Sequence, residues 1–422
     1  MYLVNIMKIC IYFNEQNCRI KKFLENKMTS NIGHLTSDIG HHTPKDLGYY
    51  FPAEFAEHEA TWLSFPHKEA SWPGKIDTIY PNYSAFVKEL ALSEKVRVNV
   101  NDEAMKAFAV KHFEKAGVNM NQVEFFIHPT NDAWCRDHGP AFLIKKSEVG
   151  SRMSDVTAGI QHRTSNIGHP ISDIGHQTSD IGHQTSNKAV IDWGYNAWGN
   201  KYPPYDLDDV IPTLIAKQFN LPVFYPGIVM EGGSVEFNGK GTLLTSTACL
   251  LNPNRNPHLK QKQIEQYLCD YYGVEQILWV DEGIVGDDTD GHIDDTVRFV
   301  NENTVLTVVE ENKSDENYAL LQHNLRQLKQ MRLLNGQQLN IVELPMPDEI
   351  IYEDQPLPAS YANFYIANKS VIVPTYRCAK DDKALQIIQQ CFPERKVVGI
   401  DSTDIIWGLG SFHCLSQQEP KV

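Results

Sequence analysis

Four polar segments of the chain hold the side chains that could carry out chemistry. They are Asn131-Asp-Ala-Trp-Cys-Arg-Asp-His-Gly-Pro140, Met230-Glu-Gly-Gly-Ser-Val-Glu-Phe237, Asp287-Asp-Thr-Asp-Gly-His-Ile-Asp-Asp-Thr-Val-Arg298 and the tail around Cys414. Together they offer a thiol, histidines and several carboxylates. Each segment lies at the edge of a predicted strand, where a rigid scaffold can direct polar side chains into one pocket.

Cys414 lies eight residues before the end of the sequence, behind a Gly-x-Gly turn and next to a histidine. Chain ends usually fray, and a free cysteine on its own is most simply a small buried hydrophobe. The upstream segments change this interpretation, because they supply His292 and the carboxylates of Asp137, Glu231 and Asp294. His292 and Asp294 are two residues apart, so they face the same side of an extended strand start.

One thiol, one histidine and several carboxylates fit a substrate that carries a planar cation. Carboxylates bind a guanidinium group bidentately, matching its fork of N–H donors. A thiolate can then attack the central carbon, while a histidine protonates the departing amine and later deprotonates the attacking water. A cysteine protease also uses Cys and His, but it does not need three acidic groups around the scissile atom. Guanidine hydrolysis is therefore the better fit.

The third segment also has a metal-binding interpretation. Asp287, Asp288 and Asp290 followed by Gly291 resemble the start of a calcium loop, but the glutamate that ends such a loop is missing. His-x-Asp alone is a weak metal signal. We therefore predict no metal site, and we expect Asp287 and Asp288 to lie in a solvated acidic turn.

The motifs resemble those of the agmatine deiminase/bacterial peptidylarginine deiminase family. The resemblance covers about 48–422 apart from one inserted segment, and the motifs follow the order of the family. The matching stretches are Phe51-Pro-Ala-Glu-Phe-Ala-Glu-His-Glu-Ala-Thr-Trp62, Trp134-x-Arg-Asp-x-Gly-Pro140, Glu231-Gly-Gly-Ser, Gly291-His-Ile-Asp-Asp295, Leu357-Pro-Ala-Ser-Tyr-Ala-Asn-Phe-Tyr-Ile-Ala-Asn368 and His413-Cys-Leu-Ser-Gln-Gln.

The resemblance implies an α/β fold of the pentein type, a propeller of five pseudo-repeated ββαβ units around a central acidic site. It implies that Cys414 is the nucleophile and that His292 is the general acid and base. It also implies that Asp137 and Asp294 clamp the guanidinium, with Glu231 contributing to the same pocket.

Other residues near these motifs have less central predicted roles. The resemblance implies that Trp134 lines the pocket against the alkyl stem of the substrate, and Asn363 is a further candidate for substrate binding. We expect Asp295 to accept a hydrogen bond behind the clamp. Cys135 is expected to be packed rather than reactive, and Arg136 is expected to pair with a neighbouring acid because a cationic substrate would repel it.

The implied reaction converts agmatine to N-carbamoylputrescine and ammonia through a covalent Cys-amidino (thiouronium) intermediate, a step of putrescine and polyamine biosynthesis. No metal or organic cofactor is implied. Alternatives remain open: a peptidylarginine or free-arginine deiminase that forms citrulline, or a non-enzymatic protein that binds guanidinium or a metal. Free arginine would call for cations to hold its carboxylate, and no Arg cluster marks such a site. Where agmatine deiminases carry Gly-Gly-Gly-Asn-Ile before His-Cys, this chain has Gly408-Leu-Gly-Ser-Phe412.

The segments between the motifs predict an alternation of strands and helices. Two segments have helical spacing, one with Ile76 to Leu90 and one with Leu321 to Met331 on a single face. The β-branched, apolar runs typical of strands are 96–100, 141–144, 189–193, 242–246, 277–280, 296–300, 304–309, 340–344 and 370–374. The pattern indicates an α/β protein with many short strands, which agrees with the fold that the resemblance implies.

A seven-residue repeat of the type Thr-Ser-Asp-Ile-Gly-His-Gln interrupts this pattern in two places, from Thr29 to His41 and from Thr164 to Asn187. Its histidines invite a metal-binding interpretation, but the repeat has little apolar content from which to build a site. They are His34, His41, His169, His176 and His183. We predict an N-terminal extension over 1–47, expected to be disordered, and a catalytic domain over 48–422 with a repeat-containing loop at about 150–188.

The composition excludes several classes of partner. A net charge of −15 over 422 residues would repel nucleic acid and anionic membranes, so neither is expected to bind. Eight cysteines without a Cys-x-x-Cys pair indicate reduced thiols rather than a zinc or disulfide framework. The first residues lack the features of a signal peptide, and no stretch is apolar enough to span a bilayer. We expect a cytoplasmic enzyme, for which a homo-oligomer would be unsurprising.

Overall fold

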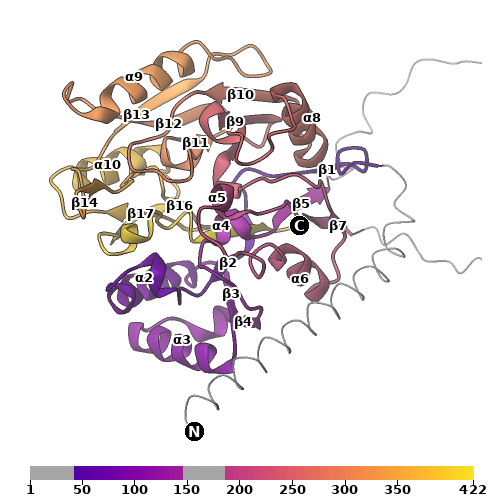
Figure 1. The fold of residues 1–422 in the computed structure, drawn as a ribbon, viewed down its shortest axis with the longest axis vertical. Coiled ribbons are helices and arrows are strands. Elements are labelled where there is room, and N and C mark those ends of the chain that lie inside the picture. The colour runs from indigo at the N-terminus through magenta and orange to yellow at the C-terminus, as the bar shows by residue number, and fades with distance from the viewer. Residues whose placement is uncertain (1–41, 146–185) are drawn as a thin grey trace, which may run out of the picture.

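The computed structural model describes residues 42–145 and 186–422 (Figure 1). Within these ranges short strands and helices alternate, as the sequence predicts for a mixed α/β protein. The repeat histidines His34, His41, His169, His176 and His183 lie outside the described residues. So do most of the predicted extension over 1–47 and most of the predicted loop at about 150–188.

Within the described residues, five sheets share one arrangement of strands: the first strand is antiparallel to the second, and the second is parallel to the third. A fourth strand extends two of these sheets. The first sheet contains β19 (Ser416–Pro420), β2 (His58–Ser64) and β3 (Lys95–Val100), with β4 (Val123–Ile127) added parallel to β3. The second contains β5 (Ala141–Lys145), β6 (Lys188–Ile191) and β7 (Val223–Phe224), with β1 (Tyr49–Tyr50) added antiparallel to β5.

The other three of these sheets have three strands each. They are β8 (Val235–Phe237), β9 (Thr242–Ser246) and β10 (Gln276–Val280); β11 (Val297–Asn301), β12 (Thr304–Val309) and β13 (Asn340–Pro345); and β16 (Tyr365–Ile366), β17 (Ser370–Thr375) and β18 (Lys396–Asp401). A separate hairpin is formed by β14 (Ile351–Tyr352) and β15 (Gln355–Pro356).

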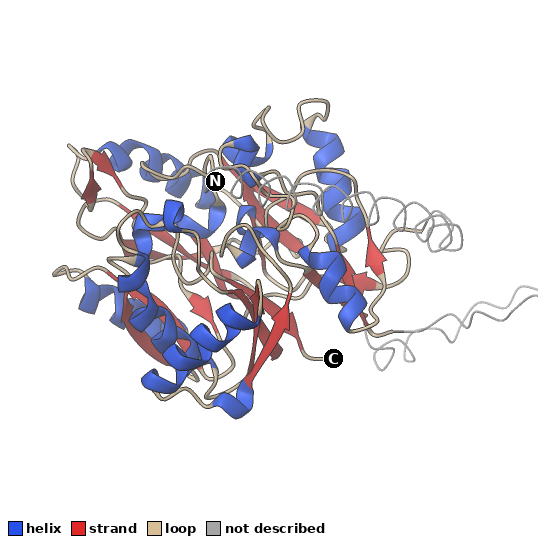
Figure 2. Ribbon diagram, turned by 60° about the horizontal axis from the view of Figure 1, so that its bottom comes forward, coloured by secondary structure: helices blue, strands red, loops and turns tan. Residues whose placement is uncertain are grey.

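Helices make the crossovers that parallel strand pairs require. These are α2 (Ile76–Leu90), α3 (Glu103–Ala116), α6 (Ile211–Gln218), α8 (Gln261–Tyr272), α9 (Glu316–Leu328) and α10 (Asp381–Cys391). In Figure 1 they lie toward the outside of the molecule, whereas the short helices α4 (Cys135–His138) and α5 (Ala197–Asn200) lie near its middle. Figure 2 shows strands running through the interior with helices around them. The remaining short helices are α7 (Thr247–Leu250), η1 (Glu69–Ser71), η2 (Met120–Gln122), η4 (Gly232–Ser234), η5 (Ile293–Asp295) and η6 (Ile405–Gly408).

Local sequence explains where several of these helices form. The face of α2 predicted from the periodicity is buried against the core, apart from the half-buried Ile76. In α3 the carboxylate of Asp102 accepts a hydrogen bond from the backbone N of Met105 at 2.7 Å, and Gly117 ends the helix in the left-handed conformation. Helix α9 ends at Leu328, so Met331 follows the helix rather than extending it.

The C-terminal strand β19 is buried along its length, which is unusual for a chain end. It pairs with β2 near the start of the described chain, with Ser416 opposite Leu63. The indole of Trp62 donates a hydrogen bond to Glu419 at 2.8 Å. Because Cys414 directly precedes this strand, the position of the thiol is fixed by a strand that is held in a sheet.

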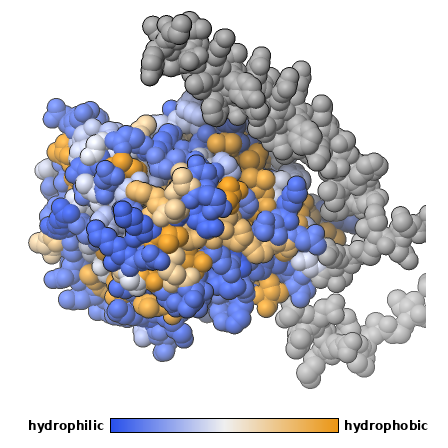
Figure 3. All heavy atoms as spheres, turned by 90° about the horizontal axis from the view of Figure 1, so that it is seen from below, coloured by the Kyte–Doolittle hydropathy of each residue, from blue (hydrophilic) through white to orange (hydrophobic). Residues whose placement is uncertain are grey.

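The surface shown in Figure 3 is largely hydrophilic, with hydrophobic atoms scattered among the polar ones and gathered toward the middle of this face. Over 42–145 and 186–422, no helix combines the length and the apolar character needed to cross a bilayer.

Candidate active site

The sequence-predicted site residues come from equivalent places in the five sheets. In each sheet they lie just before the strand that forms the antiparallel pair. Asp137 precedes β5, Glu231 precedes β8, His292 and Asp294 precede β11, Asn363 precedes β16 and Cys414 precedes β19. The structure therefore brings together side chains that are up to 277 residues apart in sequence, as the backbone hydrogen bond from Arg136 N to Cys414 O also shows.

Cys414 is 6% exposed and sits against amide and carboxylate groups. The side-chain amide of Asn363 donates to Cys414 Sγ at 3.0 Å, and Asp294 Oδ2 lies 3.7 Å from the same sulfur. Burial raises the pKa of the Cys414 thiol well above its usual value, and the carboxylates of Asp294, Asp295 and Asp137 raise it further. In the empty site the sulfur is therefore a thiol at neutral pH.

His292 is fully buried among three carboxylates. Its Nδ1 lies 3.7 Å from Asp137 Oδ1 and 3.9 Å from Asp294 Oδ1, and its Nε2 lies 3.8 Å from Glu231 Oε2. Neither ring nitrogen has a hydrogen-bond partner within the described residues. Burial alone would lower the pKa of His292, but the surrounding anions, Asp137 first among them, raise it well above its usual value.

Asp137 is held by two donors. Its Oδ2 accepts from the indole Nε1 of Trp198 at 2.9 Å, and its Oδ1 accepts from the backbone N of Gly233 at 2.9 Å. Burial raises the pKa of Asp137. The backbone of Trp198 has φ 55° and ψ 47°, a left-handed conformation that costs a non-glycine residue roughly 1–2 kcal/mol. Trp198 was not predicted from the sequence; a tryptophan directly before Gly199 was the available signal.

Glu231 lies behind His292 rather than on the wall of the open cavity. Its Oε1 accepts from Arg255 Nε at 2.8 Å, and Cys249 Sγ lies 3.8 Å from its Oε2. Although burial raises the pKa of Glu231, the charge of Arg255 lowers it below its usual value. Glu231 therefore acts on the site through its contact with the imidazole ring of His292. Neither Arg255 nor Cys249 was found from the sequence.

The donor atoms of Glu231, Cys249 and His292 lie within 4.8 Å of one another, a spacing that a metal ion would accept. Arg255 already places its positive charge on Glu231, so a further cation there would be repelled. We therefore assign these side chains to the imidazole environment and not to a metal.

The prediction that Asp287 and Asp288 lie in a solvated turn was correct for the turn, but the carboxylate of Asp287 is bound to backbone amides instead of solvent. Asp287 Oδ2 accepts from the backbone N of Gly291 at 2.9 Å and of His292 at 3.1 Å. Asp288 is half-buried and accepts from the hydroxyl of Tyr202. The acidic run satisfies backbone amides and fixes the loop that carries His292, which its spacing alone does not reveal.

An open cavity of about 220 Å³ leads to the sulfur of Cys414. Its walls are largely aromatic, and Trp134 packs on Trp72 with ring centroids 5.1 Å apart. The aromatic residues on its walls are Trp134, Trp198, Tyr202, Tyr352 and Trp407. Asp137 and Cys414 line the same cavity, whereas Asn363, His292 and Asp294 do not line it; Asn363 contacts the sulfur of Cys414. A ligand with an apolar stem and a cationic head would match these walls.

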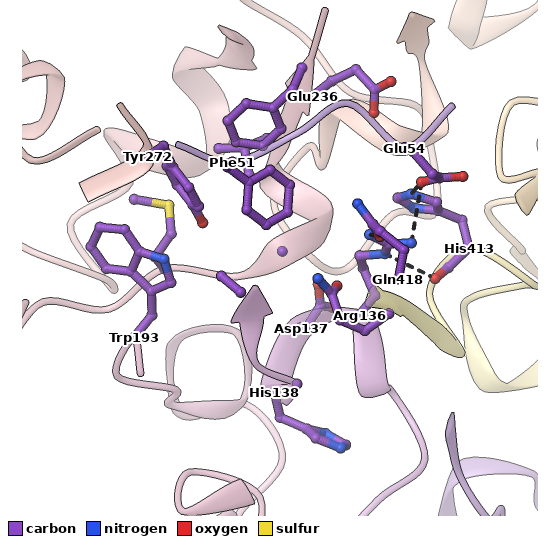
Figure 4. Close-up of a pocket in the computed structure, with 17 residues that line it drawn as sticks. Phe51, Glu54, Arg136, Asp137, His138, Trp193, Glu236, Tyr272, His413 and Gln418 are labelled. Carbon is purple, nitrogen blue, oxygen red and sulfur yellow. Dashed lines mark hydrogen bonds and ion pairs between the residues drawn. The ribbon is translucent and has the colours of Figure 1, made fainter. Parts of the chain in front are cut away.

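A smaller cavity of about 20 Å³ lies on the other side of Asp137 (Figure 4). It has room for about one water molecule. Arg136 lines it and donates to Gln418 at 2.6 Å and to Glu54 at 3.3 Å, which confirms that it pairs with a neighbouring acid. Cys135 is fully buried, and burial raises its pKa to about 12, so it is packed as predicted.

Comparison with known proteins shows which proteins this chain is similar to. A family model described as Porphyromonas-type peptidyl-arginine deiminase matches residues 50–420. The chain is 33% identical over 383 residues to a Legionella pneumophila (strain Paris) protein that bears the provisional name of agmatine deiminase, covering 90% of this chain and 97% of the relative.

Two solved structures are also similar. The agmatine deiminase of Enterococcus faecalis is 28% identical, with a TM-score of 0.76 over 90% of this chain and 98% of that one. A Cys-to-Ser variant of the C. jejuni agmatine deiminase, solved with substrate bound, is 30% identical, with a TM-score of 0.73 over 88% of this chain and 96% of that one.

Proposed function

The chain belongs to the Porphyromonas-type peptidyl-arginine deiminase family, and from this premise we propose that it hydrolyses the guanidinium group of agmatine to N-carbamoylputrescine and ammonia. The observation that carries the proposal is the convergence of Cys414, His292, Asp137 and Asp294. Cys414 and Asp137 line the open cavity, and His292 and Asp294 lie buried beside them. The agmatine deiminases among the similar proteins support agmatine as the substrate.

The guanidinium would bind between Asp137 and Asp294, with the alkyl stem along the aromatic walls formed in part by Trp134 and Trp198. Asp294 Oδ1 has no hydrogen-bond partner within the described residues, so it is free to accept from the substrate. The bound cation offsets the carboxylates that raise the pKa of Cys414 in the empty site. Substrate binding therefore favours the thiolate that performs the attack.

In the first chemical step, Cys414 Sγ would form a bond to the central guanidinium carbon, and the bond from that carbon to one terminal nitrogen breaks. The protonated His292 would give its proton to this nitrogen, which leaves as ammonia. Water then attacks the covalent amidino adduct and gives one proton to His292. As the C=O bond of the ureido product forms, the C–S bond breaks and the second water proton goes to the departing sulfur, which restores the Cys414 thiol. Asn363, which donates to Cys414 Sγ at 3.0 Å, would hold the sulfur during both steps.

We also propose that the five similar sheets are the five units of a pentein propeller. The shared order of antiparallel and parallel strands and the crossover helices support this assignment. The catalytic domain would then run over 48–422, with the repeat-containing loop inserted at about 150–188 between β5 and β6.

An arginine deiminase is the main alternative within the same family. Free arginine would bring a carboxylate into the cavity mouth, where an unpaired cation would be needed to bind it. Lys68 lines the cavity, but its Nζ lies 3.1 Å from Asp132 Oδ2 and is already paired. This pairing favours a substrate without a carboxylate at that end.

A substrate panel tests the proposed function. We expect ureido product from agmatine, little from free arginine or an arginine-containing peptide, and none from the Cys414→Ala variant. Colorimetric detection of the ureido group with parallel measurement of ammonia checks this. Activity on the peptide alone would support the proposed mechanism but show that the substrate is peptidylarginine. Agmatine binding without turnover in the wild-type protein would show that the chain is a guanidinium-binding protein.

Gly233→Ala is expected to lower kcat/KM for agmatine by roughly 100-fold, because small displacements of catalytic groups have effects of this size. A Cβ atom at this position would lie 2.6 Å from His292 Nδ1, 2.9 Å from Asp137 Oδ1 and 3.0 Å from Asp294 Oδ2. Steady-state kinetics checks the prediction. Gly399→Ala is the matched control, since its Cβ would lie 2.9 Å from Thr375 Cγ2 away from the site; an equal loss in both variants would argue against the assignment.

A further inference from the structure

His413 precedes the proposed nucleophile directly, yet the proposed chemistry gives its side chain no role. The ring is 1% exposed and lies between two carboxylates. Its Nδ1 is 2.6 Å from Asp294 Oδ2, and its Nε2 is 2.7 Å from Glu54 Oε2. An ionised carboxylate only accepts hydrogen bonds, so both ring nitrogens must donate if both carboxylates are ionised. In that state the ring is a buried imidazolium.

Glu54 is held in its ionised form by several donors. Its Oε2 also accepts from Arg298 at 3.0 Å and from Arg136 at 3.3 Å, and its Oε1 accepts from the backbone N of Ile366 at 2.8 Å. Although burial raises the pKa of Glu54, the positive charges of Arg298, His413 and Arg136 hold it well below its usual value. Glu54 is therefore a fixed anion that keeps a proton on the facing nitrogen of His413.

The two carboxylate oxygens of Asp294 have different surroundings. Its Oδ2 faces His413 and, at 3.7 Å, Cys414 Sγ, while its Oδ1 faces His292 at 3.9 Å and has no hydrogen-bond partner within the described residues. One oxygen is thus fixed by the protein and the other is left for a ligand. Burial raises the pKa of Asp294, but the hydrogen bond and charge of His413 lower it below its usual value.

Other charged groups also act on Asp294. Asp295 follows it in η5 and Asp137 faces the same imidazole from α4; burial raises the pKa of both, and a negative charge on either opposes ionisation of Asp294. Asp287, in the preceding loop, and Asp294 also repel each other. His292 and Arg298 act in the other direction and lower the pKa of Asp294, and Arg298, in β11, also pairs with Glu236 of β8 and with Glu54. His413 is the cation in direct hydrogen-bond contact with Asp294.

We propose that His413 is a positively charged positioning residue: held by Glu54 through one ring nitrogen, it orients Asp294 through the other, so that Asp294 Oδ1 can accept from a guanidinium. This inference rests on the proposed function for its consequence in catalysis, but the charge state of the ring does not depend on which substrate is used. Its role is to act through Asp294, since both ring nitrogens of His413 already contact carboxylates of the protein.

His413→Asn separates the charge from the hydrogen bond. An Asn amide nitrogen takes the place of Nδ1 and can still donate to Asp294, but it is neutral. Asp294 then needs a higher pH to ionise, so the acid limb of kcat/KM for agmatine should move up by about one pH unit or more. At the alkaline plateau the variant should recover most of the wild-type kcat, while His413→Ala, which also loses the donor, should not.

His128→Asn is the matched control, because His128 is also buried and hydrogen-bonded, at 3.0 Å to Asn99, but lies outside the site. It should lower stability without moving the pH profile. An unchanged acid limb in His413→Asn, or an equal shift in His128→Asn, would overturn the positioning role.

A second measurement does not require turnover. Nitrogen NMR of ¹⁵N-histidine-labelled protein at pH 7 should show one ring, absent from His413→Asn, with both nitrogens protonated and little exchange with solvent. A neutral ring at this position would overturn the proposal even if agmatine is a good substrate. A charged ring together with no agmatine turnover would support the charged state of His413 but contradict the proposed function.

Discussion

Cys414→Ser is expected to reduce agmatine turnover by roughly 10⁴-fold or more, as loss of an enzymatic nucleophile does. A serine hydroxyl is a much weaker nucleophile than a thiolate, and the carboxylates around it would oppose its ionisation further. The clamp of Asp137 and Asp294 remains in place, so agmatine should still bind. Quenched-flow detection of ureido product, with calorimetric measurement of agmatine affinity, separates the two effects.

The matched control for this variant is Cys391→Ser, at a half-buried thiol in the last turn of α10. It should retain near wild-type kcat. Alkylation provides a further check: because burial and carboxylates raise the pKa of Cys414, iodoacetamide should react slowly with it at pH 7 and faster as the pH rises. Turnover by Cys414→Ser within tenfold of wild type would remove Cys414 from the mechanism.

His292→Gln is expected to lower kcat by roughly 10²–10⁴-fold, the range for losing a general acid and base. The raised pKa of His292 means that the acidic form persists above the usual value of about 6.5, and it is lost only as the pH rises through the raised value. The wild-type profile should therefore keep its activity through neutral pH and fall on the alkaline side. Steady-state kinetics as a function of pH checks both the loss and this limb, which the variant should lack.

The role of His292 in the first step can be isolated with a better leaving group. An S-alkylisothiourea analogue of agmatine releases a thiol, which departs with less need of a proton than ammonia does. His292→Gln should release this thiol in a burst and accumulate the amidino adduct on Cys414, detectable by intact-protein mass spectrometry. Failure of the analogue to restore the first step would assign His292 to positioning instead of proton transfer.

Much of the scaffold could be predicted from the sequence, because β-branched runs mark strands that are buried on both faces. The strands β3, β9 and β12 lie within one residue of their predicted ranges. Strand β19 was not predicted, since its residues are the polar sequence Ser416-Gln-Gln-Glu-Pro420. Their partners, such as Trp62 and Arg136, are more than 280 residues away, and local sequence carries no record of such contacts.

The candidate site divides in the same way. Asp137, His292, Asp294 and Cys414 could be found because their types and the motifs around them point to one reaction, and the structure places them together. The residues that hold these side chains in place could not be predicted. Trp198 reaches Asp137 only through a left-handed backbone, and Arg255 reaches Glu231 across 24 residues of intervening chain. These supports depend on tertiary geometry rather than on residue type.

The pairing of β19 with β2 has a consequence for when activity can appear during synthesis. The sulfur emerges from the ribosome after the other proposed catalytic groups, and the strand beside it must then find a partner laid down more than 350 residues earlier, as the bond from Trp62 to Glu419 shows. Contacts of such long sequence separation form slowly. Nascent chains and products of 3′-truncated messages would therefore have no activity. Activity would appear only when β19 pairs with β2.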